Sequence, residues 1–187
     1  MGARGSRPEL TEEIVGRLVR RYSTAVVLFH HAVAERLGLG PTDHKCLDLL
    51  RERGAMTGSE LAAITGLTTG AITGVVARLE RAGYLRRESD PHDGRKQILS
   101  PALERVRDIH DVFDPMHKDL AALLESFDTR QLTAIADFLA RGTDFAYRHV
   151  ALLRSDTVRR GPESQDYTSN YPTRAPMKIQ RRSTFRK

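Results

Sequence analysis

The chain has 187 residues and a mass of 21.0 kDa, with 40% hydrophobic residues, 29% charged residues and no Trp. This composition is typical of a soluble, helix-rich globular protein, and no apolar run approaches the roughly 20 residues that a membrane-spanning helix needs. The single cysteine excludes an intrachain disulfide, and the basic N-terminus lacks the apolar core of a signal peptide. We therefore expect a cytoplasmic protein that makes no membrane contact.

The positive charge of the chain lies mostly at its C-terminal end. The net charge is +6, of which residues 155–187 carry +5 and residues 1–154 only +1. Within residues 78–96 the balance is +2. Because a charge run is usually a solvated surface, the overall charge does not by itself identify a nucleic-acid-binding protein.

The N-terminal half begins with two predicted helices. Apolar residues spaced by three and four predict a long amphipathic helix over residues 10–37, which ends at Gly38. A second helix is predicted over residues 42–53, with Thr42 or Asp43 as its cap.

Two shorter helices follow, separated by a glycine turn. Thr57 and Glu60 fit a capping box at the start of a helix over residues 58–65. The next helix, the fourth and the longer of these two, is predicted over residues 69–82; it is preceded by Gly66 and capped by Thr68 or Thr69. Its apolar residues predict one buried face, made by Ile72, Val75, Val76 and Leu79.

The pattern then changes to short strands before two more helices. Residues 84–87 and 96–100 are strand candidates, and the turn-forming residues between them predict a β-hairpin with a polar, basic tip. Helices are predicted over residues 101–125 and 129–153. Pro115 should kink or divide the first of them, and Asp128 or Thr129 should cap the second.

These elements predict a mainly α (α+β) fold: a winged helix-turn-helix with N- and C-terminal dimerisation helices. The long helices carry more apolar surface than a small helical core can cover, so we expect them to bury it against a second copy. The predicted organisation is a disordered N-terminus at residues 1–9, a helical dimerisation region at 10–40 and 101–154, a DNA-binding lobe at 41–100 and a basic, disordered tail at 155–187.

The start of the fourth predicted helix has the residues that a DNA-reading helix needs. A helix that enters the major groove presents its N-terminal turns to the base edges, so small and hydrogen-bonding side chains are favoured there. Two glycines lie in these turns, although each disfavours a helix by up to about 1 kcal/mol, and this indicates a close approach of the backbone. The alternative is that they are small packing residues. The candidates are Thr68, Thr69, Gly70, Ala71, Thr73 and Gly74, with Arg78 and Ser59 as phosphate contacts.

The arrangement resembles the MarR (multiple-antibiotic-resistance regulator) family of bacterial transcription factors over about residues 10–153. The motifs that carry the resemblance are Leu61-Ala62, Gly66-Leu67-Thr68, Val75-x-x-Leu79-Glu80-x-x-Gly83-Tyr84-Leu85-x-Arg87 and Ser89-Asp90-Pro91-x-Asp93-Gly94-Arg95-x-x-x-Leu99. The resemblance implies an obligate homodimer whose terminal helices interleave and whose two wings flank the DNA. One departure is Ser100-Pro101, where members often have Thr or Ser followed by Gly.

The resemblance also implies roles for residues of the wing. Arg95 would enter the minor groove, and Asp93 would orient its guanidinium through a charge-assisted pair. The alternative for Arg95 is a solvated charge at the hairpin tip. Arg86, Arg87 and Lys96 are phosphate candidates, or are merely exposed.

Family members release DNA when a small, often aromatic or phenolic, anion binds between the dimerisation helices and the DNA-binding lobe. The pocket candidates are Tyr22, Phe29, His30, His44, Phe113 and Met116, for which ordinary core packing is the favoured alternative.

The single cysteine and three of the histidines are candidates for redox or metal chemistry. Cys46 is a candidate redox sensor, but a small buried thiol is the favoured interpretation. Three histidines, at positions 30, 31 and 44, could meet at a metal ion with Asp43 or Asp48. Because adjacent histidines on a helix point in different directions, we expect neither a metal site nor a cofactor.

Motifs of common enzyme classes are absent from the sequence. It contains no glycine-rich phosphate loop, nucleophile elbow or HExxH motif, so we expect no enzyme. Together with the helix-turn-helix pattern, the resemblance to the MarR family implies a transcriptional regulator, a ligand-responsive repressor that binds a pseudo-palindromic DNA operator as a homodimer. The alternative is a winged-helix module that binds protein or RNA through its basic tail.

Overall fold

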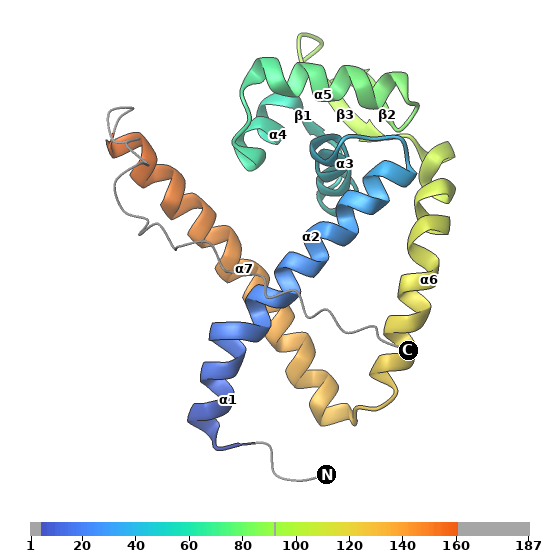
Figure 1. Ribbon diagram of the computed structural model, residues 1–187. Coiled ribbons are helices and arrows are strands. Elements are labelled where there is room, and N and C mark those ends of the chain that lie inside the picture. The colour runs from blue at the N-terminus through green and yellow to red at the C-terminus, as the bar shows by residue number, and fades with distance from the viewer. Residues whose placement is uncertain (1–4, 92, 161–187) are drawn as a thin grey trace, which may run out of the picture. The chain divides into compact units, whose positions relative to one another are not determined.

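The computed structural model describes residues 5–91 and 93–160, and the chain divides into two compact units, residues 1–125 and 126–187 (Figure 1). The first unit contains the predicted winged helix-turn-helix and the helices that flank it. The second contains one long helix. Among the described residues no single helix is long and apolar enough to cross a membrane; only the pair of helices Gly58–Thr65 and Thr69–Arg81, bent by 114°, passes by length and composition.

The first predicted helix begins earlier than expected. It consists of α1 (Arg7–Glu13), a π-helical segment η1 (Ile14–Leu18) and α2 (Val19–Arg36). The backbone N–H of Ser6 donates to the Glu9 carboxylate at 2.6 Å, which caps the first turn. The prediction of disorder for residues 1–9 is therefore wrong from residue 7 onward, and residues 1–4 lie outside the described part.

Helix α3 (Pro41–Arg53) follows a short glycine-containing turn. Gly40 is the N-cap and Pro41 occupies the first turn, so neither Thr42 nor Asp43 caps this helix as predicted. The helix ends at Gly54, whose φ of +86° only glycine adopts without strain.

The helix-turn-helix has the predicted caps. Strand β1 (Met56–Thr57) leads into α4 (Gly58–Thr65), and the Thr57–Glu60 capping box is present. Gly66 makes the turn with a left-handed φ of +73°. Helix α5 (Thr69–Arg81) begins after Thr68, whose hydroxyl accepts from the Ala71 N–H at 3.2 Å.

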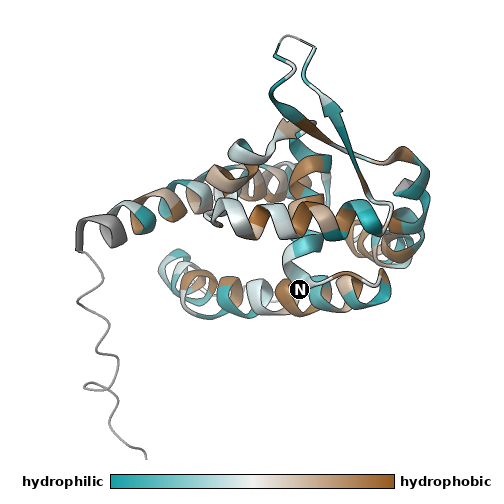
Figure 2. Cartoon of the chain, turned by 90° about the horizontal axis from the view of Figure 1, so that it is seen from above, coloured by the Kyte–Doolittle hydropathy of each residue, from teal (hydrophilic) through white to brown (hydrophobic). Residues whose placement is uncertain are grey.

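A three-stranded antiparallel sheet forms the wing. Strands β2 (Leu85–Ser89) and β3 (Gln97–Pro101) make the predicted hairpin, and the strand order is β1-β3-β2. Strand β1 was not predicted; it joins the sheet by pairing Met56 with Leu99. Figure 2 shows the hairpin extending away from the helices of the first unit.

One hydrophobic core holds the lobe together. It includes the predicted inner face of α5, and Leu50, Leu61 and Leu79 are completely buried. Removing such side chains from water is the main favourable contribution to folding. The core consists of Leu39, Cys46, Leu47, Leu50, Met56, Leu61, Ile72, Val75, Val76, Leu79, Tyr84, Leu85, Leu99 and Ile109.

Helix α6 (Val106–Leu124) follows the 3-10 turn η2 (Leu103–Arg105). Pro115 lies inside α6, which continues through it. The sequence predicted a kink or a division at this proline, and the helix is not divided. Proline in a helix interior costs about 3 kcal/mol, but α6 packs Ile109 and Phe113 against the core of the lobe. Tertiary packing thus keeps the helix in one piece.

The second unit contains α7 (Thr129–Arg160). Asp128 caps it as predicted, because the Gln131 N–H donates to the Asp128 carboxylate at 2.8 Å. The helix runs beyond residue 153, so the predicted tail is helical over residues 155–160 and the prediction of disorder is wrong there. Residues 161–187, the rest of that tail, lie outside the described residues.

Candidate nucleic-acid interface

The first turns of α5 present small polar residues to the outside of the lobe. Thr68, Thr69, Gly70, Ala71 and Thr73 are all exposed. The Thr73 hydroxyl donates to the Thr69 carbonyl at 2.9 Å, which leaves the oxygen of that hydroxyl free to accept from a ligand. The opposite side of the helix is buried in the core. The helix is thus held by its apolar face while its N-terminal polar face is available.

The two glycines of this face have different surroundings. A methyl group placed on Gly70 meets no atom within 4 Å, whereas one on Gly74 lies 3.2 Å from the guanidinium of Arg78. Packing within the first unit therefore gives no reason for glycine at position 70. The alternative prediction, a small packing residue, has no support at Gly70 and limited support at Gly74.

The wing ends in basic residues. Arg95 and Lys96 are exposed, and the Arg95 side chain makes no ion pair with a described residue. The predicted pair between Asp93 and the Arg95 guanidinium is not formed in the free chain. The Asp93 carboxylate instead accepts from the Arg95 backbone N–H at 3.2 Å and lies 3.7 Å from Nζ of Lys96. Asp93 thus shapes the turn and leaves the guanidinium of Arg95 exposed.

Three arginines predicted as phosphate contacts are paired with acidic side chains. Arg78 donates to both carboxylate oxygens of Asp43, at 2.7 and 2.8 Å, and this hydrogen bonding raises the pKa of Arg78. Arg86 pairs with Glu104 and Arg87 with Glu80. Arg78 differs from the other two because its partner Asp43 is buried, so this pair joins α5 to α3 and has a structural role that sequence reasoning missed.

At the start of α4, Ser59 is exposed as predicted. The Glu60 carboxylate accepts from the N–H and the hydroxyl of Thr57, and these bonds lower the pKa of Glu60. A negative charge therefore lies beside the helix N-terminus that was expected to face a phosphate, and Ser59 is the weaker of the predicted contacts.

The part of the chain that matches a known protein family contains the same helix-turn-helix and wing. A family model described as the MarR family matches residues 37–96, from the end of α2 to the wing tip. An HTH-type transcriptional regulator of Bacillus subtilis, YcgE, itself uncharacterised, is 40% identical over 154 residues, 82% of this chain and 99% of that protein. The chain belongs to the MarR family. As predicted, it is a MarR-family transcriptional regulator and not an enzyme.

Solved structures agree on the winged-helix fold. A MarR family protein from Bacillus stearothermophilus has a TM-score of 0.60 at 24% identity, covering 77% of this chain and 99% of that one. The transcriptional regulator Tm0710 of Thermotoga maritima has a TM-score of 0.55 at 23% identity, covering 74% and 98%.

This MarR-family chain has a pocket of about 420 Å³ in its first unit. Of the six residues predicted to line a ligand site, only His30 lines this pocket. Tyr22 is 65% exposed, and Phe29, His30, His44 and Phe113 pack together as an aromatic cluster. The pocket is lined by Val27, His30, His31, Pro41, Thr42, Lys45, Cys46, Thr65 and Leu67.

Cys46 has the surroundings of a packing residue. Its side chain is 1% exposed, and burial raises the pKa of its thiol to about 11. The nearby Asp43 carboxylate raises it further, while Arg78 opposes the shift. Because the thiolate is the reactive form, a raised pKa favours the buried-thiol interpretation over a redox sensor.

Proposed function

We propose that this MarR-family regulator binds double-stranded DNA as a homodimer, with the N-terminal turns of α5 in the major groove and the wing tip along the minor groove. The observation that carries the proposal is the exposed surface from Thr68 to Thr73, which is free of bulky apolar side chains. Arg95, which is exposed near the tip of the hairpin and makes no ion pair with a described residue, supplies the second contact.

The residues of this surface and the arginines around it suit base edges, a close backbone approach or phosphate groups. Thr69 and Thr73 have hydroxyls that suit base edges or phosphates, and Gly70 permits a close approach of the helix backbone. Arg78 is held by Asp43 and has a side chain that is 53% exposed, so its remaining N–H groups suit a phosphate in a fixed position. Arg86 and Arg87 must exchange a carboxylate partner for a phosphate.

The dimer is supported by apolar side chains that the first unit leaves exposed on its terminal helices. Such surface on long helices favours a partner chain. A two-fold dimer then offers two α5 helices about 34 Å apart to a pseudo-palindromic operator. The exposed residues include Val15, Val19, Val27, Leu28, Leu120 and Leu123 in the first unit, and Phe138, Leu139, Phe145 and Leu153 in the second.

We further propose that the regulator is a repressor released by a small aromatic or phenolic anion. The pocket suits such a ligand because its lining is mostly apolar and includes one cationic residue, Lys45. It also touches Thr65 and Leu67, which lie at the end of α4 and in the turn before α5. A ligand there displaces the turn that positions the recognition helix.

The test is fluorescence anisotropy with DNA from upstream of the protein's own coding sequence. Wild type is expected to bind one site at least about 10³-fold more tightly than random DNA. Arg95→Ala should weaken specific binding by about 1–3 kcal/mol with the dimer intact. Arg51→Ala on α3 is the matched control that should have no effect, because Arg51 is exposed and lies outside both the proposed DNA contacts and the dimerisation helices. An unchanged affinity for Arg95→Ala rejects the wing contact. A chain shortened after Arg160 that loses most of its affinity, with little sequence preference, supports the tail-driven alternative.

A further inference from the structure

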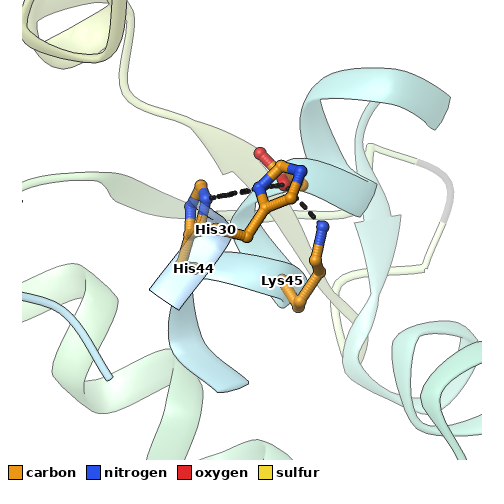
Figure 3. Close-up of polar contacts among 4 residues, drawn as sticks. His30, His44 and Lys45 are labelled. Atoms are coloured by element: carbon orange, nitrogen blue, oxygen red, sulfur yellow. Dashed lines mark hydrogen bonds and ion pairs between the residues drawn. The ribbon is translucent and has the colours of Figure 1, made fainter. Parts of the chain in front are cut away.

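Two helices bring a group of nitrogen and oxygen ligands together beside the aromatic cluster. His30 comes from α2, and His44 and Asp48 come from consecutive turns of α3. Nδ1 of His30 lies 3.2 Å from Nε2 of His44. The Asp48 carboxylate oxygen Oδ2 lies 3.6 Å from the first nitrogen and 3.7 Å from the second. Figure 3 shows the two rings turned toward each other.

These three distances fit a metal ion. The point equidistant from the three atoms lies about 2.0 Å from each of them, and Zn²⁺ bonds to histidine nitrogen and carboxylate oxygen measure roughly 2.0–2.2 Å. The spacing of His44 and Asp48, four residues apart on one helix, places both ligands on the same face.

One of the two rings lies almost entirely inside the protein. His44 is 1% exposed, and its other nitrogen, Nδ1, has no hydrogen-bond partner among the described residues. The polar side-chain contacts that His44 makes with described residues are therefore made through Nε2, the nitrogen that faces His30 and Asp48.

We propose that His30, His44 and Asp48 form a binding site for one divalent transition-metal ion, of which Zn²⁺ is the best match, that joins α2 to α3. Two imidazoles and one carboxylate favour such an ion over Mg²⁺ or Ca²⁺, which prefer oxygen ligands alone. Three protein ligands leave a coordination position for water, and the pocket that His30 lines gives water access. The proposal is independent of the DNA contact proposed above.

Lys45 is the competitor for this site. Its Nζ lies 3.2 Å from the same Asp48 oxygen. Figure 3 shows Lys45 beside the two rings. The Lys45 side chain is 55% exposed, so it moves into solvent when an ion binds. Removing the positive charge of Lys45 therefore strengthens metal binding.

The experiment titrates the full-length, metal-free protein with Zn²⁺ in competition with a chromophoric chelator, and follows thermal unfolding in parallel. About one ion is expected per protomer, with a higher melting temperature when it is bound. Asp48→Asn and His30→Gln, at partly exposed positions, should each weaken binding at least about tenfold. Lys45→Gln should tighten it.

Three controls make the test specific. His31→Gln changes the adjacent, exposed histidine outside the cluster, and Cys46→Ser removes the thiol that lines the nearby pocket; both should bind Zn²⁺ as wild type does. Circular dichroism verifies that each variant is folded. No Zn²⁺ binding by the wild type, or equal binding by folded Asp48→Asn and His30→Gln, overturns the proposal, as does a loss of binding in His31→Gln or Cys46→Ser alone.

Discussion

Replacing Gly70 by alanine should change stability and DNA binding in opposite directions. The position lies in the first turn of α5, has no positive φ, and offers open space to a methyl group within its unit. Alanine is favoured over glycine in a helix by up to about 1 kcal/mol, so the free energy of unfolding should rise by roughly 0.5–1 kcal/mol. For a chain of this length, that corresponds to a melting temperature higher by about 1–4 °C.

The same methyl group stands on the surface proposed to face the bases. If the backbone at Gly70 approaches the DNA closely, the methyl prevents the closest approach, and operator affinity should fall at least about tenfold, or 1.4 kcal/mol. The assay combines thermal unfolding followed by circular dichroism with anisotropy on operator DNA. A gain of stability together with wild-type affinity refutes the reasoning, because the open side of Gly70 then does not face DNA.

Gly142→Ala is the matched control for this experiment. Gly142 lies inside α7, and a methyl group there also meets nothing within 4 Å. The variant should gain similar stability and keep its operator affinity. Size-exclusion chromatography of both variants verifies that the oligomeric state is unchanged.

Other features of the lobe give three further predictions. Cys46, with a thiol pKa of about 11 against an ordinary 9.0, should react with a disulfide reagent at pH 8 at least about 100-fold more slowly in the folded protein than in denaturant, and rapid labelling would contradict its burial. Leu79→Ala, at a fully buried position, should lower the free energy of unfolding by about 2–5 kcal/mol in urea titrations; a loss under 1 kcal/mol argues against its place in the core. Thr68→Ala should cost about 0.5–2 kcal/mol by removing the cap on the Ala71 N–H, whereas Thr68→Ser should cost little.

Local signals in the sequence predicted most of the elements. Caps such as Thr57 with Glu60, Thr68 and Asp128 act within one helical turn, and glycines such as Gly66 act at a single residue. The helix ends that these caps and glycines set can therefore be predicted from the sequence without knowing the fold. The apolar spacing of α5 predicted its buried face for the same reason.

Contacts between distant residues were not predictable in this way. Strand β1 has two residues and exists only because Met56 and Thr57 pair with β3. The Arg78–Asp43 pair joins residues 35 positions apart, whereas the local sequence around Asp43 indicates only a possible helix cap, at Thr42 or Asp43. The pocket forms where α2, α3 and the turn before α5 pack together. This dependence on packing explains why only one of the six residues predicted to line a ligand pocket, His30, lines it.

The group formed by His30, His44 and Asp48 combines a local sequence signal with a contact between distant residues. The sequence predicts no metal site here, because the adjacent His30 and His31 point in different directions on their helix. The spacing that matters is His44 with Asp48, and the third ligand arrives from another helix. A search for mixed histidine and carboxylate spacings finds the first pair, but only the packing of α2 on α3 brings His30 to it.

The regulator's mode of DNA binding is tested most directly by hydroxyl-radical footprinting on its own upstream DNA. The proposed interface predicts protection at two half-sites centred about one helical turn apart, with additional minor-groove protection on either side. Arg95→Ala should lose the flanking protection and keep the two centres. Uniform protection without a preferred site, or a footprint that Arg95→Ala leaves intact, contradicts the account.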